Sequence, residues 1–487
     1  MASIEELRSE RVKKLEKIKE AGMNPYPARS SRTNTIDDVL SQFKDLEKSG
    51  EEITIAGRVM VARGQGAIRF IDLRDGTGKL QAVLKADVLD EKLFELFGAV
   101  IDAGDFIEVS GTLFVTQKGQ ESIEVRDWKM LSKSLLPLPD KWHGLVDEDS
   151  RLRKRYLDIL LNNELQDVLK KRAKFWDATR SFMNEKGFLE VETPTLETTT
   201  GGAEARPFIT HHNDMDMDVF LRISVGELWQ KRLMAAGMEK TFEIGRVYRN
   251  EGTSPNHVQE FTNMEFYWAY ADYKDGMKLA QELYQHIAQE VFGTTKFKSG
   301  EHEFDLSGEW GTVDYYGEVE RQTGVDLKSA SDDDIKKKLD ELKVKYEGDN
   351  RERLMDTLWK YCRKNISGPV FLINHPKLVS PLAKEVEDNG EFTQRFQPII
   401  AGVEIGNGYS ELNDPLEQRA RFETQQELLK GGDEEAMMPD WEFVEMLEHG
   451  MPPTCGFGFG ERLFAVLLDK PVRETQTFPL VRVKEDA

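Results

Sequence analysis

Two neighbouring predicted strands within residues 241–273 carry side chains that could bind a nucleotide and an amine. Alternate side chains of a strand face the same way, so Arg249 and Glu251 share a face of the first segment. The matching face of the second segment carries Phe261, Asn263, Glu265 and Tyr267. If the segments pair as a hairpin, this surface offers a cation for phosphate, a flat ring for a base and carboxylates for an amine. Taken alone, the pattern also fits an amphipathic hairpin with a charged outer face.

A second nucleotide-binding element is predicted at residues 455–462, Cys-Gly-Phe-Gly-Phe-Gly-Glu-Arg. Glycine at every second position, including Gly458 and Gly460, leaves one face of a strand bare, so a flat base can lie close to the backbone. Arg462 begins the helix predicted to follow, and it could cover the other side of the base by a cation–π contact and reach phosphate. The glycine alternation is weak evidence by itself, and the arginine and apolar helix after it strengthen the prediction.

Residues 404–411, with the sequence EIGNGYSE, form a third element. Alternation places three of its polar side chains on one face: Asn407, Tyr409 and Glu411. With Glu227 and Glu265, this face predicts a pocket that holds several carboxylates and few cations. A buried ammonium must be paired, so such a pocket suits the amine of lysine and would repel aspartate.

The composition excludes several classes of protein. A chain of 487 residues is too long for one core, and two or three domains are expected. It is 39% hydrophobic and 32% charged, without an apolar run of about 18 residues, so we expect no membrane association. The net charge of −22 argues against indiscriminate nucleic-acid binding, although local basic patches could still bind RNA.

Cysteine use and the first residues indicate the compartment. Only two cysteines occur, Cys362 and Cys455, which excludes a disulfide framework and a cysteine-rich zinc site. The first residues lack the apolar core of a signal peptide. Both observations favour a cytoplasmic protein.

The order of predicted elements indicates an α+β chain. Residues 1–50 are predicted to be an N-terminal helical segment, and the alternating segments of 51–135 a small five-stranded β-barrel, for which the OB fold is a candidate. Residues 136–150 form a proline-containing linker. We expect 151–487 to form an antiparallel sheet flanked by helices, with a helical insertion at about 291–369 that carries no candidate chemistry.

Several motifs resemble those of the class II aminoacyl-tRNA synthetases. Arg249-x-Glu251, a loop with His257, and Glu260-Phe261 resemble motif 2, while residues 186–194 and 455–462 resemble motifs 1 and 3. The segments GGAEARPFITHHN, EIGNGYSELNDP and EHGMPPT are similar to the lysyl-tRNA synthetase branch of this class. The resemblance extends from the N-terminal helix to Arg482.

The resemblance implies an OB-fold anticodon-binding domain followed by a class II catalytic domain. The implied reaction is ATP-dependent activation of L-lysine to lysyl-adenylate, followed by transfer to the 3′ end of tRNA(Lys). Mg²⁺ would assist, and motif 1 implies a homodimer. No covalent enzyme intermediate is needed, so no serine, cysteine or histidine triad is expected.

The resemblance also assigns roles to individual residues. Arg249, Arg462 and Glu404 are the implied catalytic residues. ATP would contact Arg249, Glu251, His257, Phe261, Glu404, Gly458, Gly460 and Arg462. Lysine would contact Glu227, Arg249, Glu265, Tyr267, Asn407, Tyr409 and Glu411. The metal would be held by Glu404 and, less securely, Gln397, and the anticodon would be read by Phe70, Gln81 and Asp127.

The sequence departs from the family pattern at several of these positions. Gln397 stands where a second acidic metal ligand is normal, so the number of metal ions and their affinity are open. Asn256 removes one cation from the motif 2 loop, and Asp127 stands where glutamate is usual. Strict alternation also puts Glu404 on the face opposite Asn407, unless a bulge at Gly406 or Gly408 intervenes.

Three alternative functions remain at this stage. An aspartyl- or asparaginyl-type synthetase shares the order of domains, but its pocket needs cations for the substrate carboxylate. A lysine ligase that acts on a protein would resemble only the catalytic half. A non-catalytic tRNA-binding paralogue would explain Gln397 and Asn256, although the chain retains Arg249, Glu404 and Arg462.

Overall fold

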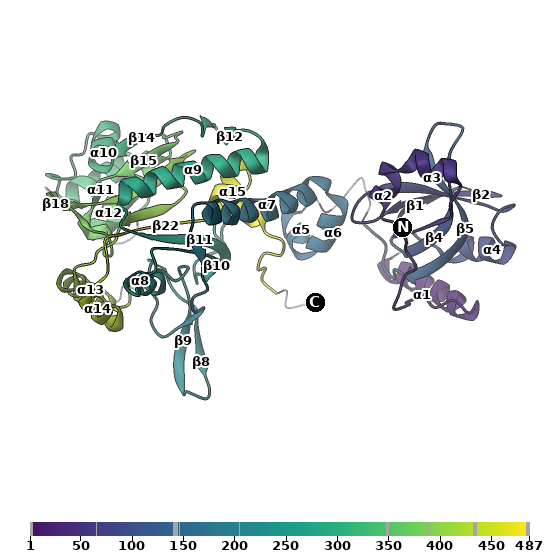
Figure 1. Ribbon diagram of the computed structural model, residues 1–487, viewed down its shortest axis with the longest axis horizontal. Helices are drawn as coiled ribbons and strands as arrows, with labels where there is room; N and C mark the ends of the chain where they lie inside the picture. Colours follow the sequence, from purple (N-terminus) through teal and green to yellow (C-terminus); the bar gives the residue numbers. More distant parts are fainter. Residues whose placement is uncertain are drawn as a thin grey trace. The chain divides into compact units, whose positions relative to one another are not determined.

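The computed structural model divides the chain into two compact units, Met1–Glu148 and Asp149–Ala487, each of which is described by itself (Figure 1). It describes residues 3–64, 66–139, 145, 147–203, 205–346, 350–387, 389–431 and 436–483. The predicted linker at 136–150 therefore lies partly outside the described residues. Among the described helices, none is both long enough and apolar enough to cross a membrane.

The first unit is a closed five-stranded barrel with helices against it. The strands follow the order β1-β2-β3-β5-β4 around the barrel. Its elements are α1 (Ile4–Glu20), α2 (Ile36–Ser41), α3 (Phe43–Ser49), β1 (Ile53–Arg63), β2 (Ile68–Arg74), β3 (Lys79–Lys85), α4 (Glu91–Val100), β4 (Phe106–Val115) and β5 (Glu121–Ser132). Alternate residues of the strands, such as Ile53 and Ile55 of β1, fill the interior. The prediction of a five-stranded barrel is confirmed.

The second unit is built on one large mixed sheet. Its strands follow the order β14-β15-β19-β21-β22-β11-β10-β6, with β20 paired to β19. The pairings are antiparallel except for β10 with β6 and β14 with β15, which are parallel. The sheet strands are β6 (Leu189–Glu190), β10 (Lys240–Tyr248), β11 (Glu260–Ala269), β14 (Gly311–Asp314), β15 (Val370–Ile373), β19 (Arg395–Ile400), β20 (Val403–Glu404), β21 (Asn407–Ser410) and β22 (Thr454–Gly460).

Shorter strands and helices surround this sheet. The smaller sheets contain β7 (Leu196–Glu197), β8 (Ile209–His212), β9 (Met217–Leu221), β12 (Lys296–Ser299), β13 (His302–Asp305), β16 (His375–Pro376), β17 (Glu385–Val386) and β18 (Asn389–Thr393). The helices are α5 (Glu148–Arg153), α6 (Arg155–Leu161), α7 (Asn163–Glu185), α8 (Glu227–Ala235), α9 (Tyr273–Phe292), α10 (Tyr315–Thr323), α11 (Asp332–Glu341), α12 (Arg351–Arg363), η1 (Lys377–Val379), α13 (Pro415–Lys430), α14 (Trp441–Glu448), α15 (Arg462–Leu467) and η2 (Val472–Thr475).

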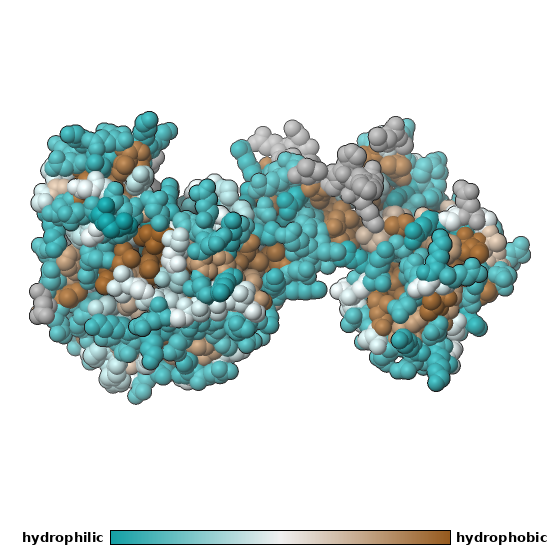
Figure 2. Space-filling model, turned by 90° about the horizontal axis from the view of Figure 1, so that it is seen from above, coloured by the Kyte–Doolittle hydropathy of each residue, from teal (hydrophilic) through white to brown (hydrophobic). Residues whose placement is uncertain are grey.

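The two faces of β22 have different neighbours, which explains its alternating sequence. Phe457 and Phe459 point into the main core, where α7 and α9 lie side by side against the sheet (Figure 1). The alternate glycines face the other way. The surface outside these cores is mostly hydrophilic on the face in Figure 2, as the charged composition predicts.

The segment at 291–369 differs from its prediction. Helices α10, α11 and α12 do form, around a core that includes Leu354, Leu358 and Trp359. However, the segment also contains strands β12 to β14, and β14 pairs with β15 to become an edge of the main sheet. A parallel pairing of this kind joins residues far apart in the sequence, and local periodicity carries no signal for it.

Candidate active site

One cavity of about 1130 Å³ in the second unit brings the predicted catalytic and binding residues together. Fifteen of them line it: Glu227, Arg249, Glu251, His257, Phe261, Glu265, Tyr267, Gln397, Glu404, Asn407, Tyr409, Glu411, Gly458, Gly460 and Arg462. They come from α8, β11, β19 to β22, α15 and the loop between β10 and β11. Residues more than 200 positions apart in the sequence therefore share one site.

The hairpin predicted to organise the site forms as β10 and β11. The strands are antiparallel, with Tyr248 opposite Glu260, so Arg249 and Glu251 lie just beyond β10 and not within it. The Arg249 backbone N–H donates to the Gln259 carbonyl at 2.8 Å, which continues the pairing by one residue. Phe261 lies within β11 as expected.

The Arg249 side chain is anchored but keeps donors for a ligand. Its Nε and Nη2 donate to the Ile223 carbonyl, each at 3.3 Å, and its Cζ lies 5.4 Å from the centre of the Phe261 ring. Burial lowers the pKa of Arg249 from its ordinary value. Because a guanidinium carries five N–H donors, several remain for an anion in the cavity.

The glycines of β22 make room for acidic side chains. A Cβ at Gly456 would lie 2.1 Å from Glu411 Oε1, and a Cβ at Gly458 would lie 2.7 Å from the Glu265 side chain. Any larger residue would displace these carboxylates. The bare face predicted to approach a base therefore also shapes the acidic part of the cavity.

We call one part of the cavity, with the buried Lys231 that pairs with it, the amine-binding end; its lining residues are Glu227, Glu265, Tyr267, Tyr409 and Glu411. Lys231 Nζ lies 2.8 Å from Glu227 Oε1 and 2.5 Å from Glu411 Oε2. Tyr409 donates its hydroxyl to Glu227, and Tyr267 donates to Glu265 Oε2 at 3.1 Å.

The carboxylates of this end exceed its cations. Glu227, Glu265 and Glu411 are almost completely buried, and Lys231 is the one ammonium that contacts them within the described residues. Glu411 Oε1 is buried and has no hydrogen-bond partner in the described part of the chain. Such an acceptor is costly unless a donor arrives with the ligand.

The pKa values of the amine-binding end reflect this excess. Burial raises the pKa of Glu265 to about 7, and the neighbouring Glu227 charge adds to the rise. Burial also raises the pKa of Glu411 to about 8, although Lys231 opposes it. Burial alone would lower the pKa of Lys231, but Glu227 and Glu411 outweigh it and raise the pKa. A second ammonium would stabilise the ionised carboxylates.

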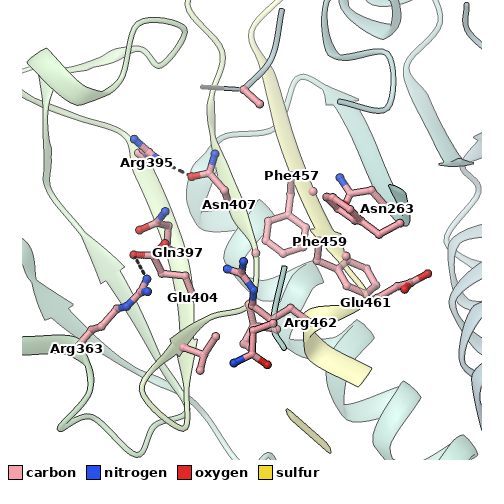
Figure 3. Close-up of a pocket in the computed structure, with 18 of the residues that line it drawn as sticks. Asn263, Arg363, Arg395, Gln397, Glu404, Asn407, Phe457, Phe459, Glu461 and Arg462 are labelled. Carbon is pink, nitrogen blue, oxygen red and sulfur yellow. Dashed lines mark hydrogen bonds and ion pairs between the residues drawn. The ribbon is translucent and has the colours of Figure 1, made fainter. Parts of the chain in front are cut away.

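In the opposite part of the cavity, which we call the phosphate-binding end, the cations exceed the carboxylates. It is formed by Arg249, Glu251, Arg363, Glu404 and Arg462. Glu404 Oε1 pairs with Arg363 Nη1 at 2.7 Å (Figure 3). The same oxygen accepts a hydrogen bond from Trp359 Nε1 at 3.0 Å. Burial opposes ionisation of Glu404, but Arg363, Trp359 and Arg395 together outweigh it and lower the pKa.

Two further contacts fix polar side chains of the cavity, and Figure 3 shows the first of them. Asn407 Oδ1 accepts from Arg395 Nε at 2.8 Å. Gln397 Oε1 lies 2.9 Å from His375 Nε2, and burial lowers the pKa of His375 to about 3. The imidazole is therefore neutral and donates from Nε2 to the amide oxygen.

Strict alternation would put Glu404 on the face opposite Asn407, but a break in the strand changes this. β20 ends at Glu404 and β21 begins at Asn407. Between them, the Ile405 backbone N–H donates to the Pro398 carbonyl at 2.9 Å. The break at Ile405 and Gly406 lets Glu404 and Asn407 line the same cavity.

In the barrel, two of the three predicted anticodon residues share a face. Phe70 of β2 and Gln81 of β3 point away from the barrel core, and Gln81 accepts from Ser122 Oγ at 3.1 Å. The alternative of a core position for Phe70 is thereby excluded. Asp127 lies five residues along β5 from Ser122, roughly 16 Å at strand spacing, so it is not beside Gln81.

The sequence interpretation missed three residues of the site: Trp359 and Arg363, which line the cavity, and Lys231, which is buried and pairs with two of the lining carboxylates. Lys231 follows Glu227 by one helical turn, a spacing that signals a side-chain pair. Trp359 and Arg363 come from α12, within the insertion to which no chemistry was assigned. No local pattern marks them, because only the tertiary fold brings α12 to Glu404.

A nucleotide-sized cavity with an anionic end and a cationic end defines an enzyme site for an amine and a polyphosphate. The family model described as tRNA synthetases class II (D, K and N) matches residues 147–482, and the one described as OB-fold nucleic acid binding domain matches residues 53–131. This chain belongs to the class II tRNA synthetase family.

Several lysine–tRNA ligases are similar in sequence to this chain over nearly its whole length. The lysine–tRNA ligase of Halalkalibacterium halodurans is 42% identical over 99% of this chain and 98% of its own. That of Thermotoga maritima is 41% identical over 99% and 97%, and that of Moorella thermoacetica is 42% identical over 99% of each. The resemblance stated from the motifs is confirmed.

Magnesium is the metal that the resemblance implies, and the donor set can be tested against it. Mg²⁺ is commonly held by one or two carboxylates together with substrate phosphates. Glu404 is such a carboxylate, whereas the Gln397 oxygen is a neutral donor already engaged by His375. Within the described ranges, no group of three or more His, Cys, Asp or Glu side chains is placed to hold a metal ion. The residues fit one ion that shares Glu404 with a nucleotide.

Proposed function

We propose that this chain activates L-lysine with ATP and transfers the lysyl group to the 3′ end of tRNA(Lys). The excess of carboxylates at the amine-binding end carries the proposal, since it suits a substrate with a second ammonium. The full-length similarity to proteins named lysine–tRNA ligase supports it independently.

Activation joins two anions, and Arg249 is suited to bring them together. A lysine carboxylate oxygen forms a bond to the α-phosphorus of ATP. The bond from that phosphorus to the oxygen that bridges the α- and β-phosphates breaks, and pyrophosphate is released. A planar guanidinium can bridge the carboxylate and the α-phosphate, which offsets their repulsion. A tRNA ribose hydroxyl then takes the lysyl group from the adenylate, and AMP leaves.

We assign the nucleotide to the phosphate-binding end and the glycine face. Phe261 would stack on adenine from one side and Arg462 from the other, above Gly458 and Gly460. Glu251 would accept from the adenine amino group. His257, which is exposed and lies 2.7 Å from Ser254 Oγ, would reach the outer phosphates from the loop.

We assign lysine to the amine-binding end. Glu411 and Tyr267 would take the ε-ammonium, with support from Glu265. Glu227 and Tyr409 would hold the α-ammonium, and Asn407 would assist at the carboxylate. Three carboxylates and one resident ammonium leave two negative charges, which match the two ammonium groups of lysine.

Glu404 would hold Mg²⁺, with Gln397 as a weaker oxygen donor. When bound, the ion neutralises phosphate charge and orients the phosphates for displacement. Glu404 is ionised before the ion arrives, because contacts with Arg363 and Trp359 lower its pKa despite burial.

The barrel would read the anticodon, with Phe70 stacking on a base and Gln81 and Asp127 bonding base edges. A homodimer would cover apolar residues around motif 1, where Leu189 is 53% exposed and Leu196 is 51% exposed. A monomer in sedimentation at micromolar concentration would contradict the dimer. We place the activity in the cytoplasm, where both buried thiols stay reduced.

Amino-acid-dependent exchange of pyrophosphate into ATP, run with all twenty amino acids, tests this function. Lysine alone should support rapid exchange, and the charged product should be tRNA(Lys). Exchange with aspartate or asparagine would identify the rival synthetase type. Absence of exchange with every amino acid would favour a non-catalytic tRNA-binding paralogue.

A further inference from the structure

The helical insertion contributes a cation to the phosphate-binding end. Helix α12 begins after Asn350, whose side chain accepts from the Arg353 backbone N–H at 2.8 Å, and ends at Arg363. Trp359 and Arg363 are four residues apart, so they lie on one side of the helix. Both reach the same atom, Glu404 Oε1.

Not all hydrogen-bond donors of the Arg363 side chain have a partner among the described residues. The ion pair with Glu404 measures 2.7 Å through Nη1, while Arg363 Nε is buried and has no hydrogen-bond partner among the described residues. The Arg363 side chain is 18% exposed and lines the cavity. A buried guanidinium N–H without an acceptor is costly, and an anion in the cavity could accept its hydrogen bond.

Two other arginines lie close to this ion pair. The pKa of Arg462 is lowered by burial and is further influenced by Glu404, Arg363 and Arg249, which places these groups together. Arg462 forms no side-chain hydrogen bond or ion pair with any residue in the ranges that the structure describes. The guanidiniums of Arg249, Arg363 and Arg462 line the cavity together with Glu404 and the exposed Glu251, so positive charge exceeds negative charge in this set. A polyanion would balance it.

We propose that Arg363 is a third phosphate-binding arginine of the ATP site. Glu404 holds it in the substrate-free cavity, and it moves to the outer phosphates when ATP enters. The move exchanges one carboxylate for a ligand of higher charge and leaves the Glu404 oxygen open to a hard cation. This inference rests on the proposed use of ATP.

A purely structural ion pair would behave differently. In that case Arg363 would only attach α12 to the sheet, and its removal would lower stability without changing ATP affinity. If instead Arg363 only blocked Glu404, its removal would tighten binding of ATP with Mg²⁺. ATP affinity therefore separates the three roles.

The test compares Arg363→Gln and Arg363→Lys with Arg321→Gln in the full-length chain. Arg321 lies on α10 of the same insertion, pairs with Glu318 at 2.5 Å, is 67% exposed and is not among the residues that line the cavity. Isothermal titration calorimetry with ATP, in Mg²⁺ and in EDTA, gives the affinity. Thermal unfolding verifies that each variant is folded.

R363Q should weaken ATP binding about tenfold to a hundredfold in both buffers, as expected for losing a hydrogen bond to a charged group. R363K should fall between R363Q and the wild type, and R321Q should match the wild type. Lysine affinity should not change in any variant. Unchanged or tighter ATP binding by folded R363Q would overturn the proposal. Failure of the proposed function is a separate result, namely no lysine-dependent exchange in the wild type.

Discussion

The amine-binding end and the phosphate-binding end use the same chemical groups in opposite proportions. The first holds three carboxylates and one ammonium, Lys231, and the second holds three guanidiniums and two carboxylates, those of Glu251 and Glu404. In each end, one charge of the minority sign pairs with a charge of the majority sign: Lys231 of α8 in the first and Glu404 of β20 in the second. The charge of the less common sign reduces the repulsion between the like charges around it. The charges that stay uncompensated attract the substrate group of opposite sign.

Removing the minority charge of the amine-binding end should have the largest effect. Lys231→Met leaves Glu227 and Glu411 buried without a cation, so we expect a loss of about 3–5 kcal/mol in the free energy of unfolding at pH 8. Urea denaturation measures it. The control is Lys360→Met, which removes an exposed pair of the same i,i+4 spacing, with Asp356, and should cost less than about 1 kcal/mol. Equal stability of K231M and the wild type would mean that the carboxyls are protonated.

Neutralising one carboxylate should affect the two substrates unequally. Glu411→Gln removes the charge opposite the ε-ammonium, so the KM for lysine should rise about a hundredfold while the KM for ATP stays the same. Pyrophosphate exchange measures both constants. Glu423→Gln, an exposed position on α13, should change neither. A parallel rise in both KM values in E411Q would show that the two ends are not independent.

Of the two ends, the amine-binding end should titrate near neutral pH. The raised pKa values of Glu265, about 7, and Glu411, about 8, mean that both carboxyls lose their protons as the pH rises from 6 to 8. Lysine should then bind about tenfold more tightly at pH 8 than at pH 6, because its ε-ammonium remains charged. Calorimetric titration with lysine at several pH values checks this, and E411Q should flatten the curve. ATP affinity should vary much less, since the pKa of Glu404 is lowered.

The same pKa shifts have an opposite consequence for stability without lysine. A carboxyl whose pKa is raised on folding stabilises the protein below its unfolded pKa, near 4.5, and that contribution is lost as the pH rises toward 8. Thermal unfolding without ligand should therefore occur at lower temperature at pH 8 than at pH 6. Added lysine should reduce the difference.

Adding a carboxylate to the phosphate-binding end should give the smallest effect. Gln397→Glu places a second acidic group near Glu404, so the affinity for Mn²⁺ as a probe of the metal site should rise about tenfold. Electron paramagnetic resonance counts bound and unbound Mn²⁺ without nucleotide. Gln120→Glu, exposed in the barrel, is the control. No change in Q397E would place the site of the metal away from Gln397.

The sequence predicted the parts of the fold that depend on local patterns. Five barrel strands, the β10–β11 hairpin and the glycine strand β22 all follow from alternation, and the residues assigned to the catalytic unit do line one cavity. Long-range effects were not predictable in this way. The parallel pairing of β14 with β15, the approach of Arg363 to Glu404 and the depth at which Lys231 is buried all depend on how distant segments pack.

Breaks and bulges within strands account for the remaining differences between the prediction and the structure. Strict alternation turned Glu404 away from the cavity, and the two-residue break before Asn407 restored it. In the barrel, the register shift between Ser110 and Gly111 leaves Arg126 without a directly opposite residue on β4. Breaks and bulges of one or two residues decide which face a side chain takes, and a binary pattern does not encode them.

Strand β22 separates the hydrophobic core from the active-site cavity and contributes side chains or backbone to both. The Phe457 ring stacks on Phe396 with their centres 5.4 Å apart and their planes 4° from parallel, while Gly456 on the opposite side leaves room for Glu411. Any loosening of the aromatic stack would shift the carboxylates directly. Loss of lysine selectivity on heating should therefore coincide with melting of the core, with no earlier stage at which the cavity fails alone.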